Sequence, residues 1–234
     1  MPAQRVLLPG LLCDSAVWQA QIDAIGPCHV PDYGTLDSLR GMAEHVLATA
    51  PAGPLAVAGH SMGGRVAFEM LRIAPERIER LALLDTSYHP LADGEAGETE
   101  RAGRMALLAT ARRDGMRAMA REWALGMVHP SRHDTPLFEA VLDMLARKTP
   151  DVFATQINAL LNRPDCTELL AHIHCPTLLL CGHEDAWSPP SRHEHMQQQI
   201  AGARLVVVEQ CGHMSTMEQP EAVSRAFIEW LAGQ

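Results

Sequence analysis

One short motif constrains the fold of this chain more than any other feature. The sequence GHSMGG at positions 59–64 follows an apolar run, Leu55 to Ala58, and precedes a helical pattern that continues to about Ile73. A strand, a sharp turn and a helix in direct succession are typical of a parallel sheet with helical crossovers. Glycine stands two positions before and two positions after Ser61, where a Cβ would collide with the crossing backbone. We therefore expect Ser61 at the carboxyl edge of a parallel sheet.

The same alternation of apolar runs and helical patterns extends along most of the chain. It predicts an α/β fold, with a mostly parallel sheet of about six strands flanked by helices. The expected strands are Arg5 to Leu8, Cys28 to Pro31, Leu55 to Ala58, Leu81 to Leu84, Thr177 to Cys181 and Leu205 to Val208. The clearest helical patterns outside the motif are Leu39 to Thr49, Arg192 to Gln199 and Ala222 to Leu231.

The alternation lapses between residues 87 and 163. This segment begins as an acidic loop and continues with helical patterning alone, without the short apolar runs that indicate strands. We interpret residues 87–163 as a helical lid inserted into an α/β core, which residues 1–86 and 164–234 form. The chain length of 234 residues suits one such domain with a modest insertion.

Large aromatic side chains in and near this insertion are candidates for substrate binding. Trp123 and Phe138 belong to its helical patterns, and Trp187 follows the expected strand Thr177 to Cys181. Lid helices often turn apolar groups toward a substrate pocket. Apolar helix faces more commonly pack on the rest of the protein, so each of these residues also has a purely structural interpretation.

Composition excludes several classes of protein. A net charge of -9 argues against a nucleic-acid partner, because nothing compensates for repulsion by the phosphates. No apolar stretch is long enough for a membrane span, and the N-terminal sequence lacks the apolar region of a signal peptide. The six cysteines have no paired spacing, so we expect reduced thiols and no metal site. These features predict a cytoplasmic protein, and no sequence motif indicates a cofactor; the oligomeric state is left open.

A serine hydroxyl becomes a good nucleophile only beside a base, so the motif requires a histidine at the same edge of the sheet. His213 is the candidate among twelve histidines, because it lies on a loop between the last expected strand, Leu205 to Val208, and a helical pattern. The N–H group of Met62, at the start of the helix after Ser61, could stabilise a developing oxyanion.

An acid that orients the histidine is expected on a third loop at this edge. Asp185 follows the strand Thr177 to Cys181, and a carboxylate there could bond the imidazole Nδ1. Glu184 in the same loop is a rival. Asp85 is another rival, because it directly follows the strand Leu81 to Leu84.

Together these residues resemble the α/β-hydrolase superfamily over nearly the whole chain except the insertion. The chain order Ser61, Asp185, His213 is the order that this fold uses for its catalytic triad. The sequence LPGLL at positions 8–12 resembles the family's oxyanion loop, although Pro9 stands where the family usually has histidine. The resemblance implies that the N–H group of Leu11 is the second oxyanion donor.

The resemblance implies a serine hydrolase, carboxylesterase-like, that cleaves a carboxylic ester of a small molecule through an acyl-enzyme. The superfamily also contains acyl transferases, haloperoxidases and C–C bond lyases. Arg65 follows two glycines as in the menaquinone-pathway lyase, so a lyase or C–C hydrolase acting on an anionic substrate is an alternative. A solvent-facing or locally paired arginine is the simpler interpretation of Arg65. A catalytically silent small-ligand receptor is a further alternative.

Overall fold

A five-stranded parallel sheet forms the centre of the described part of the chain. The computed structural model describes residues 3–233, so residues 1–2 and 234 of the predicted core lie outside it. The strands, in their spatial order, are β1 (Gln4–Leu8), β2 (Leu55–His60), β3 (Ile78–Leu84), β4 (Thr177–Gly182) and β5 (Arg204–Val208). Every residue of β2 and β4 is buried, as expected for strands covered on both faces.

One of the six expected strands, Cys28 to Pro31, does not form, and this prediction is wrong. Only His29 pairs with the sheet, through an isolated parallel bridge to Val6 on the outer side of β1. The N–H of Leu7 donates to the carbonyl of His29, and the N–H of His29 donates to the carbonyl of Arg5, both at 2.9 Å. Prolines at positions 27 and 31 flank this bridge. Because proline has no N–H to donate, the ladder cannot extend in either direction.

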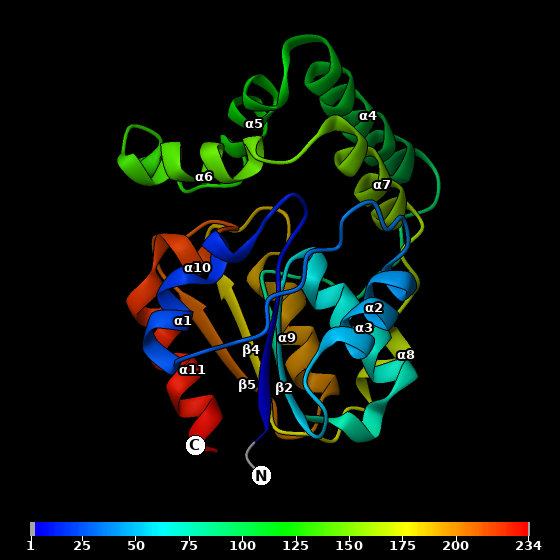
Figure 1. Cartoon of the computed structure of the whole chain (residues 1–234), viewed down its shortest axis with the longest axis vertical. Coiled ribbons are helices and arrows are strands. Elements are labelled where there is room, and N and C mark those ends of the chain that lie inside the picture. Colours follow the sequence, from blue (N-terminus) through cyan, green and yellow to red (C-terminus); the bar gives the residue numbers. More distant parts are fainter. Residues whose placement is uncertain (1–2, 234) are drawn as a thin grey trace.

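Helices cover both faces of the sheet. Figure 1 shows α1 and α11 on one side of the strands and α2 and α3 on the other. The helices of the sheet region are α1 (Gln19–Ile25), α2 (Leu39–Thr49), α3 (Met62–Ile73), α8 (Thr167–Leu170), α9 (Pro190–Gln199), α10 (Ser215–Glu218) and α11 (Pro220–Ala232). Short 3-10 turns lie at Ser15–Trp18 and Pro75–Arg77. None of the helices in residues 3–233 combines the length and hydropathy needed to cross a membrane.

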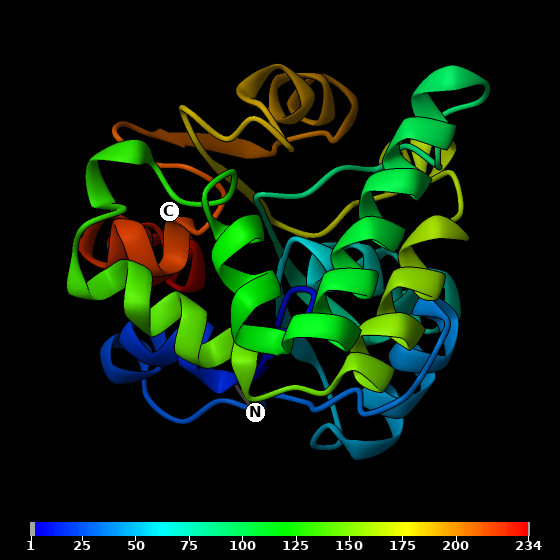
Figure 2. The same cartoon turned by 90° about the horizontal axis from the view of Figure 1, so that it is seen from above.

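Four helices between β3 and β4 lie above the carboxyl ends of the strands (Figures 1 and 2). They are α4 (Glu95–Asp114), α5 (Met116–Ala124), α6 (Pro136–Ala146) and α7 (Pro150–Leu161), with a 3-10 turn at Pro130–Arg132. The chain leaves and re-enters the sheet region at one point, because the N–H of Cys166 donates to the carbonyl of Tyr88 at 2.9 Å. The division into a core and a lid with the boundaries given above stays a prediction.

The chain leaves β1 and β2 in opposite directions at the carboxyl edge. After β1 the chain moves outward to the bridge at His29, whereas after β2 it moves in the opposite direction to β3. Loops that leave neighbouring strands in opposite directions separate, and ligands of open α/β sheets bind at such a point. The loop after β1 and the turn after β2 therefore face each other across the expected binding region.

Candidate active site

The turn between β2 and α3 holds Ser61 in a backbone conformation that few side chains adopt. Its φ is 54°, in the left-handed region. A Cβ on Gly59 would lie 2.4 Å from the carbonyl oxygen of Gly63, and a Cβ on Gly63 would lie 2.1 Å from the carbonyl oxygen of Leu8. Only glycine fits at these two positions, so the motif brings the turn into direct contact with β1.

Ser61, His213 and Asp185 form a continuous chain of hydrogen bonds. The Nε2 of His213 lies 2.9 Å from the Oγ of Ser61, and its Nδ1 lies 2.8 Å from the Oδ2 of Asp185. His213 and Asp185 are buried, whereas Ser61 is partly exposed. Side chains from three separate loops thus meet in an arrangement that can move a proton from the hydroxyl to the imidazole.

The surroundings of this group favour an ionised acid. Burial raises the pKa of Asp185, but the charge and hydrogen bond of His213 outweigh it and lower that pKa to about 2. The Oδ1 of Asp185 also accepts from the N–H groups of Trp187 at 2.9 Å and Ser188 at 3.0 Å. Burial lowers the pKa of His213, yet Asp185 raises it above its ordinary value. The carboxylate therefore stabilises the protonated imidazole.

Asp85, the rival acid, has different partners. Its Oδ1 accepts from the N–H of Gly182 at 3.1 Å, and its Oδ2 accepts from the N–H and the hydroxyl of Ser215. The Nε2 of His60 lies 3.5 Å from the same Oδ2. Burial and the nearby charge of Asp185 raise the pKa of Asp85 well above its usual range. The hydrogen bond to His213 Nδ1 is thus made by Asp185.

The backbone expected to donate to an oxyanion lies beside Ser61. Met62 is the first residue of α3, and the first N–H groups of a helix have no partner within it. A Cβ on Gly10 would lie 3.3 Å from the Cβ of Ser61, so the loop after β1 passes close to the serine. Leu11 follows in this loop with its side chain buried. The donor roles of Leu11 and Met62 stay predictions.

Comparison with known proteins identifies the family of this chain. Residues 6–226 match the model of the Alpha/beta hydrolase family. The chain belongs to this family. Among its relatives is a pimeloyl-[acyl-carrier protein] methyl ester esterase of Nitrosomonas europaea, 28% identical over 237 residues, covering 95% of this chain and 93% of the relative. An enzyme of the same description from Neisseria meningitidis is 26% identical over 220 residues, covering 93% and 84%.

Two solved structures have folds closely similar to that of this chain. A thermophilic esterase from Thermogutta terrifontis has a TM-score of 0.86 and 30% identity, covering 100% of this chain and 90% of that one. The enol-lactonase from Burkholderia xenovorans has a TM-score of 0.83 at 21% identity, covering 99% and 92%, which shows the shared fold alone. The chain is therefore an α/β hydrolase whose named relatives include esterases.

A row of aromatic rings connects His213 to the inserted helices. The ring of Trp187 lies 4.9 Å from that of His213, and the ring of Trp123 stacks on Trp187 at 5.6 Å. Phe153 of α7 follows at 5.9 Å from Trp123. Of the aromatic residues expected from the sequence, Trp187 and Trp123 thus join the site's surroundings.

Phe138 lies in a different environment within the insertion. Its buried ring lies 5.3 Å from that of His133, and the guanidinium of Arg121 lies 6.0 Å from it. None of the ring contacts found in residues 3–233 connects Phe138 to the row that begins at His213. The ring contacts support a packing role for Phe138.

Arg65 holds the start of the insertion. Its Nη1 donates to the carbonyl of His89 at 2.9 Å, and Arg163 donates to the same carbonyl at 3.3 Å. Glu100 receives two hydrogen bonds from Arg163, at 2.8 and 2.7 Å. Burial, with repulsion from Arg163, lowers the pKa of Arg65 to about 9. Its guanidinium is therefore charged at neutral pH and engaged with the segment that leads into α4.

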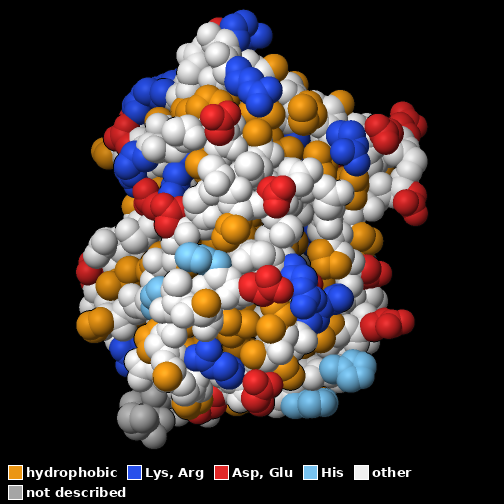
Figure 3. Space-filling view, turned by 45° about the vertical axis from the view of Figure 1, so that its right-hand side comes forward, with side chains coloured by type: hydrophobic (Ala, Val, Ile, Leu, Met, Phe, Trp, Pro, Cys, Tyr) orange, Lys and Arg blue, Asp and Glu red, His pale blue; other side chains and the backbone are white. Residues whose placement is uncertain are grey.

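Basic side chains of the insertion are largely paired at its surface. Figure 3 shows Lys and Arg side chains interspersed with acidic ones on the upper part of the molecule. Arg117 makes ion pairs with Glu139 and Asp143, and Arg121 pairs with Glu139, all of them exposed. Exposed pairs of this kind contribute little to stability and leave a solvated helix face.

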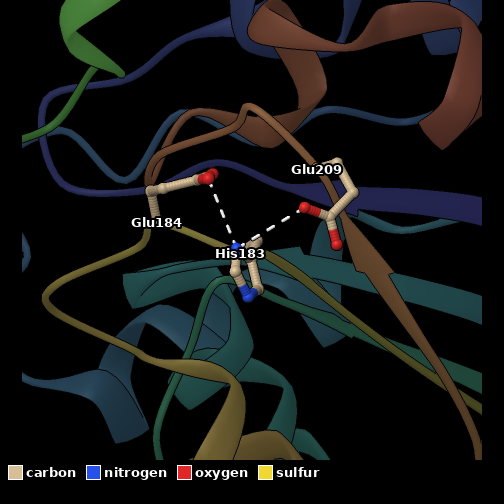
Figure 4. Close-up of side chains that lie close together, drawn as sticks. All are labelled: His183, Glu184 and Glu209. Atoms are coloured by element: carbon tan, nitrogen blue, oxygen red, sulfur yellow. Dashed lines mark hydrogen bonds and ion pairs between the residues drawn. The ribbon is translucent and has the colours of Figure 1, made fainter.

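One group of exposed side chains has the composition of a metal site. The ligand atoms of His183, Glu184 and Glu209 lie within 4.8 Å of one another (Figure 4). Glu184, the second rival acid, also accepts a hydrogen bond from the N–H of Cys211 at 2.9 Å. It therefore supports the loop that leads to His213, and the imidazole that it contacts is that of His183, at 3.3 Å. Exposed acidic groups often lie together without an ion, and we assign no metal to this one.

Two buried polar residues near the site were not predicted from the sequence. Glu218 accepts from the N–H groups of Gly212 at 3.0 Å and Met214 at 3.1 Å, which flank His213. Gln156 of α7 accepts from the N–H of Leu12 at 2.8 Å. Neither has a local sequence signal, because their partners depend on how distant segments pack together.

Proposed function

We propose that the protein is a serine hydrolase that cleaves a carboxylic ester of a small molecule. The observation that supports this most is the hydrogen-bonded series Asp185, His213, Ser61, with distances of 2.8 and 2.9 Å. A nucleophile that contacts a base, and a base that contacts an acid, is the arrangement needed for acyl transfer. Membership in a family with esterase relatives supports the same assignment.

The reaction has two steps. The Oγ of Ser61 attacks the carbonyl carbon of the ester while Nε2 of His213 accepts the proton, and the N–H groups of Leu11 and Met62 stabilise the oxyanion. Collapse of this intermediate expels the alcohol, which takes the proton from His213, and leaves an acyl-enzyme. Water, deprotonated by His213, then releases the acid and restores the hydroxyl of Ser61. Asp185 stabilises the imidazolium in both steps.

The row Trp187, Trp123 and Phe153 favours an apolar acyl group. Residues 87–163 would act as the lid that covers this group, with Trp123 and Trp187 along its path. The relatives named pimeloyl-[acyl-carrier protein] methyl ester esterase make methyl esters of medium-length acyl groups the first substrates to test. The engagement of Arg65 with the carbonyl of His89 weakens the alternative of a lyase that binds its substrate's carboxylate.

Replacement of Ser61 by alanine tests the proposal. Without the nucleophile, kcat should fall by roughly 10⁶-fold, and labelling by a fluorophosphonate probe should disappear. Ser131→Ala, which changes an exposed serine, is the matched control and should keep both. The assay uses p-nitrophenyl esters of graded chain length and a pimeloyl methyl ester, beside the menaquinone-pathway intermediate. A folded wild-type protein that is neither labelled nor active on any ester would contradict the proposal and favour the receptor alternative.

A further inference from the structure

A buried hydrogen bond connects the inserted helices to the loop after β1. The side-chain Oε1 of Gln156 in α7 accepts from the backbone N–H of Leu12 at 2.8 Å. We propose that Gln156 is a positioning residue, which holds this loop in the conformation that presents the N–H of Leu11 to the oxyanion. The inference rests on the proposed function and assigns part of the same site to the insertion.

The loop forms a turn that leucine does not favour. The N–H of Cys13 donates to the carbonyl of Gly10 at 3.1 Å, which closes a four-residue turn with Leu11 and Leu12 at its centre. Leu12 has a φ of 60°, whereas Leu11 is not among the residues with positive φ. A positive φ at the third position only is the mark of a type II turn, where glycine or asparagine is usual. The turn therefore needs an interaction that compensates for leucine.

Gln156 supplies that interaction. Rotation of the peptide between Leu11 and Leu12 would convert the turn to type I and bring the φ of Leu12 to a favourable negative value. The same rotation would turn the N–H of Leu12 away from Gln156 and its neighbouring carbonyl toward it. Leu12 is completely buried and Gln156 nearly so, and the rotated peptide would bring its carbonyl oxygen against the Oε1 of Gln156, so the side-chain amide would also have to rotate to avoid two unpaired buried acceptors. The acceptor oxygen thus favours the type II form.

The position of this loop matters because the loop lies against the nucleophile. A Cβ on Gly10 would lie only 3.3 Å from the Cβ of Ser61. The N–H of Leu11 immediately precedes the peptide that Gln156 anchors, so a loop released from Gln156 can shift and carry this N–H away from Ser61. Oxyanion donors act only when they lie within hydrogen-bond distance of the developing charge. A shifted loop would therefore bind substrate but stabilise the transition state poorly.

A second contact between insertion and loop differs from this one in exposure. Arg147 makes two hydrogen bonds to Asp14, at 2.7 and 2.9 Å, and its side chain is half exposed. Solvent screens such a pair and replaces its hydrogen bonds when it breaks. Arg147 therefore provides a matched control: it joins the same two segments without contacting the turn's central peptide.

The experiment compares Gln156→Leu, which removes the acceptor, with Gln156→Glu, which keeps it, and with Arg147→Ala. We expect Gln156→Leu to lower kcat by roughly 10- to 100-fold with little change in KM, and to weaken binding of a boronic acid transition-state analogue in proportion. Gln156→Glu should retain most of kcat, and Arg147→Ala should stay within about 3-fold of wild type.

Several outcomes would overturn the inference. An unchanged kcat and analogue affinity in Gln156→Leu would do so, and so would an effect on KM alone, which would indicate a substrate-contact role. If Gln156→Leu does not fold, Gln156→Asn keeps the amide but shortens it by one methylene, and it should show the same loss of kcat; an unchanged kcat there also contradicts the inference. Wild-type activity is measured first, because an inactive wild type would contradict the proposed function. If the wild type is active and the Gln156 variants are equally active, only the role of Gln156 is contradicted.

Discussion

The ends of β3 and β4 carry two buried carboxylates with opposite properties. Asp85 directly follows β3, and Asp185 lies in the loop after the neighbouring strand β4. The pKa of Asp85 is raised by burial and by the charge of Asp185, whereas the pKa of Asp185 is lowered to about 2 by His213 despite its burial. Both were candidates for the acid beside the histidine. Only their partners distinguish them.

This contrast teaches that position at the carboxyl edge does not by itself define a role. Asp185 is paired with an imidazole that can become a cation, so its ionised form is favoured. Asp85 receives neutral donors from Gly182 and Ser215, which join the loops after β4 and β5 to the end of β3. We infer that Asp185 acts in the proton transfer and that Asp85 holds together the loops around it.

Loss of charge at the two positions should separate their effects on activity most strongly. Asp185→Asn should lower kcat by about 10⁴-fold, because an amide cannot stabilise the imidazolium or its correct tautomer. Asp85→Asn should cost less than about 10-fold, because the amide keeps one acceptor oxygen for the loops around the site and Asp85 makes no hydrogen bond to the imidazole of His213. Steady-state kinetics on one ester measures both. Equal losses in the two variants would break the comparison.

Removal of the whole side chain should instead affect the stability of the protein. Asp85→Ala leaves buried donors of Gly182 and Ser215 unsatisfied and should lower the free energy of unfolding by about 3 kcal/mol. Asp85→Asn keeps one acceptor oxygen and should cost about 1 kcal/mol. Urea denaturation followed by circular dichroism measures these values, with the exposed Asp151→Ala as the control. A fully stable Asp85→Ala protein would contradict the structural role.

The pH dependence of stability should have opposite signs at the two positions, with the smallest effect of the three. A lowered pKa means that Asp185 stabilises the folded state above pH 3.8 and loses this contribution as the pH falls toward about 2. A raised pKa means that Asp85 favours folding at low pH and loses this contribution as the pH rises above 3.8. The free energy of unfolding of wild type and of each Asn variant is measured between pH 2 and neutrality, and each variant's value is subtracted from that of wild type. The difference should rise with pH for Asp185→Asn and fall with pH for Asp85→Asn. The same pH dependence for both variants would contradict these signs.

The sequence predicted the parts of this site that depend on local patterns. The glycines around Ser61 and the apolar runs before Asp85, Asp185 and His213 located four loops at one edge of the sheet. The segment Cys28 to Pro31 does not form a strand, because Pro27 and Pro31 have no N–H to donate on either side of the single bridge at His29. The pattern of apolar runs alone cannot show which of Asp85 and Asp185 bonds the histidine, since both residues follow buried strands. The catalytic roles themselves stay predictions until the variants are measured.

Contacts between distant segments could not be predicted in this way. Gln156 and Leu12 are 144 positions apart, and nothing around either residue indicates the other. Glu218 lies five positions after His213, but only the folded loop turns the N–H groups of Gly212 and Met214 toward its carboxylate. Such buried polar contacts depend on tertiary packing, which a single sequence does not encode in any short pattern.

The meeting of Tyr88 and Cys166 has a consequence for how proteins of this kind diversify. Because a backbone hydrogen bond of 2.9 Å already brings these positions together, whatever chain connects them begins and ends at one place on the scaffold. The entropic cost of a longer connection grows only slowly with its length. A helical segment from another protein could therefore replace the one between Tyr88 and Cys166. Such an exchange would change which compounds bind and would leave the order of the strands in the sheet unchanged.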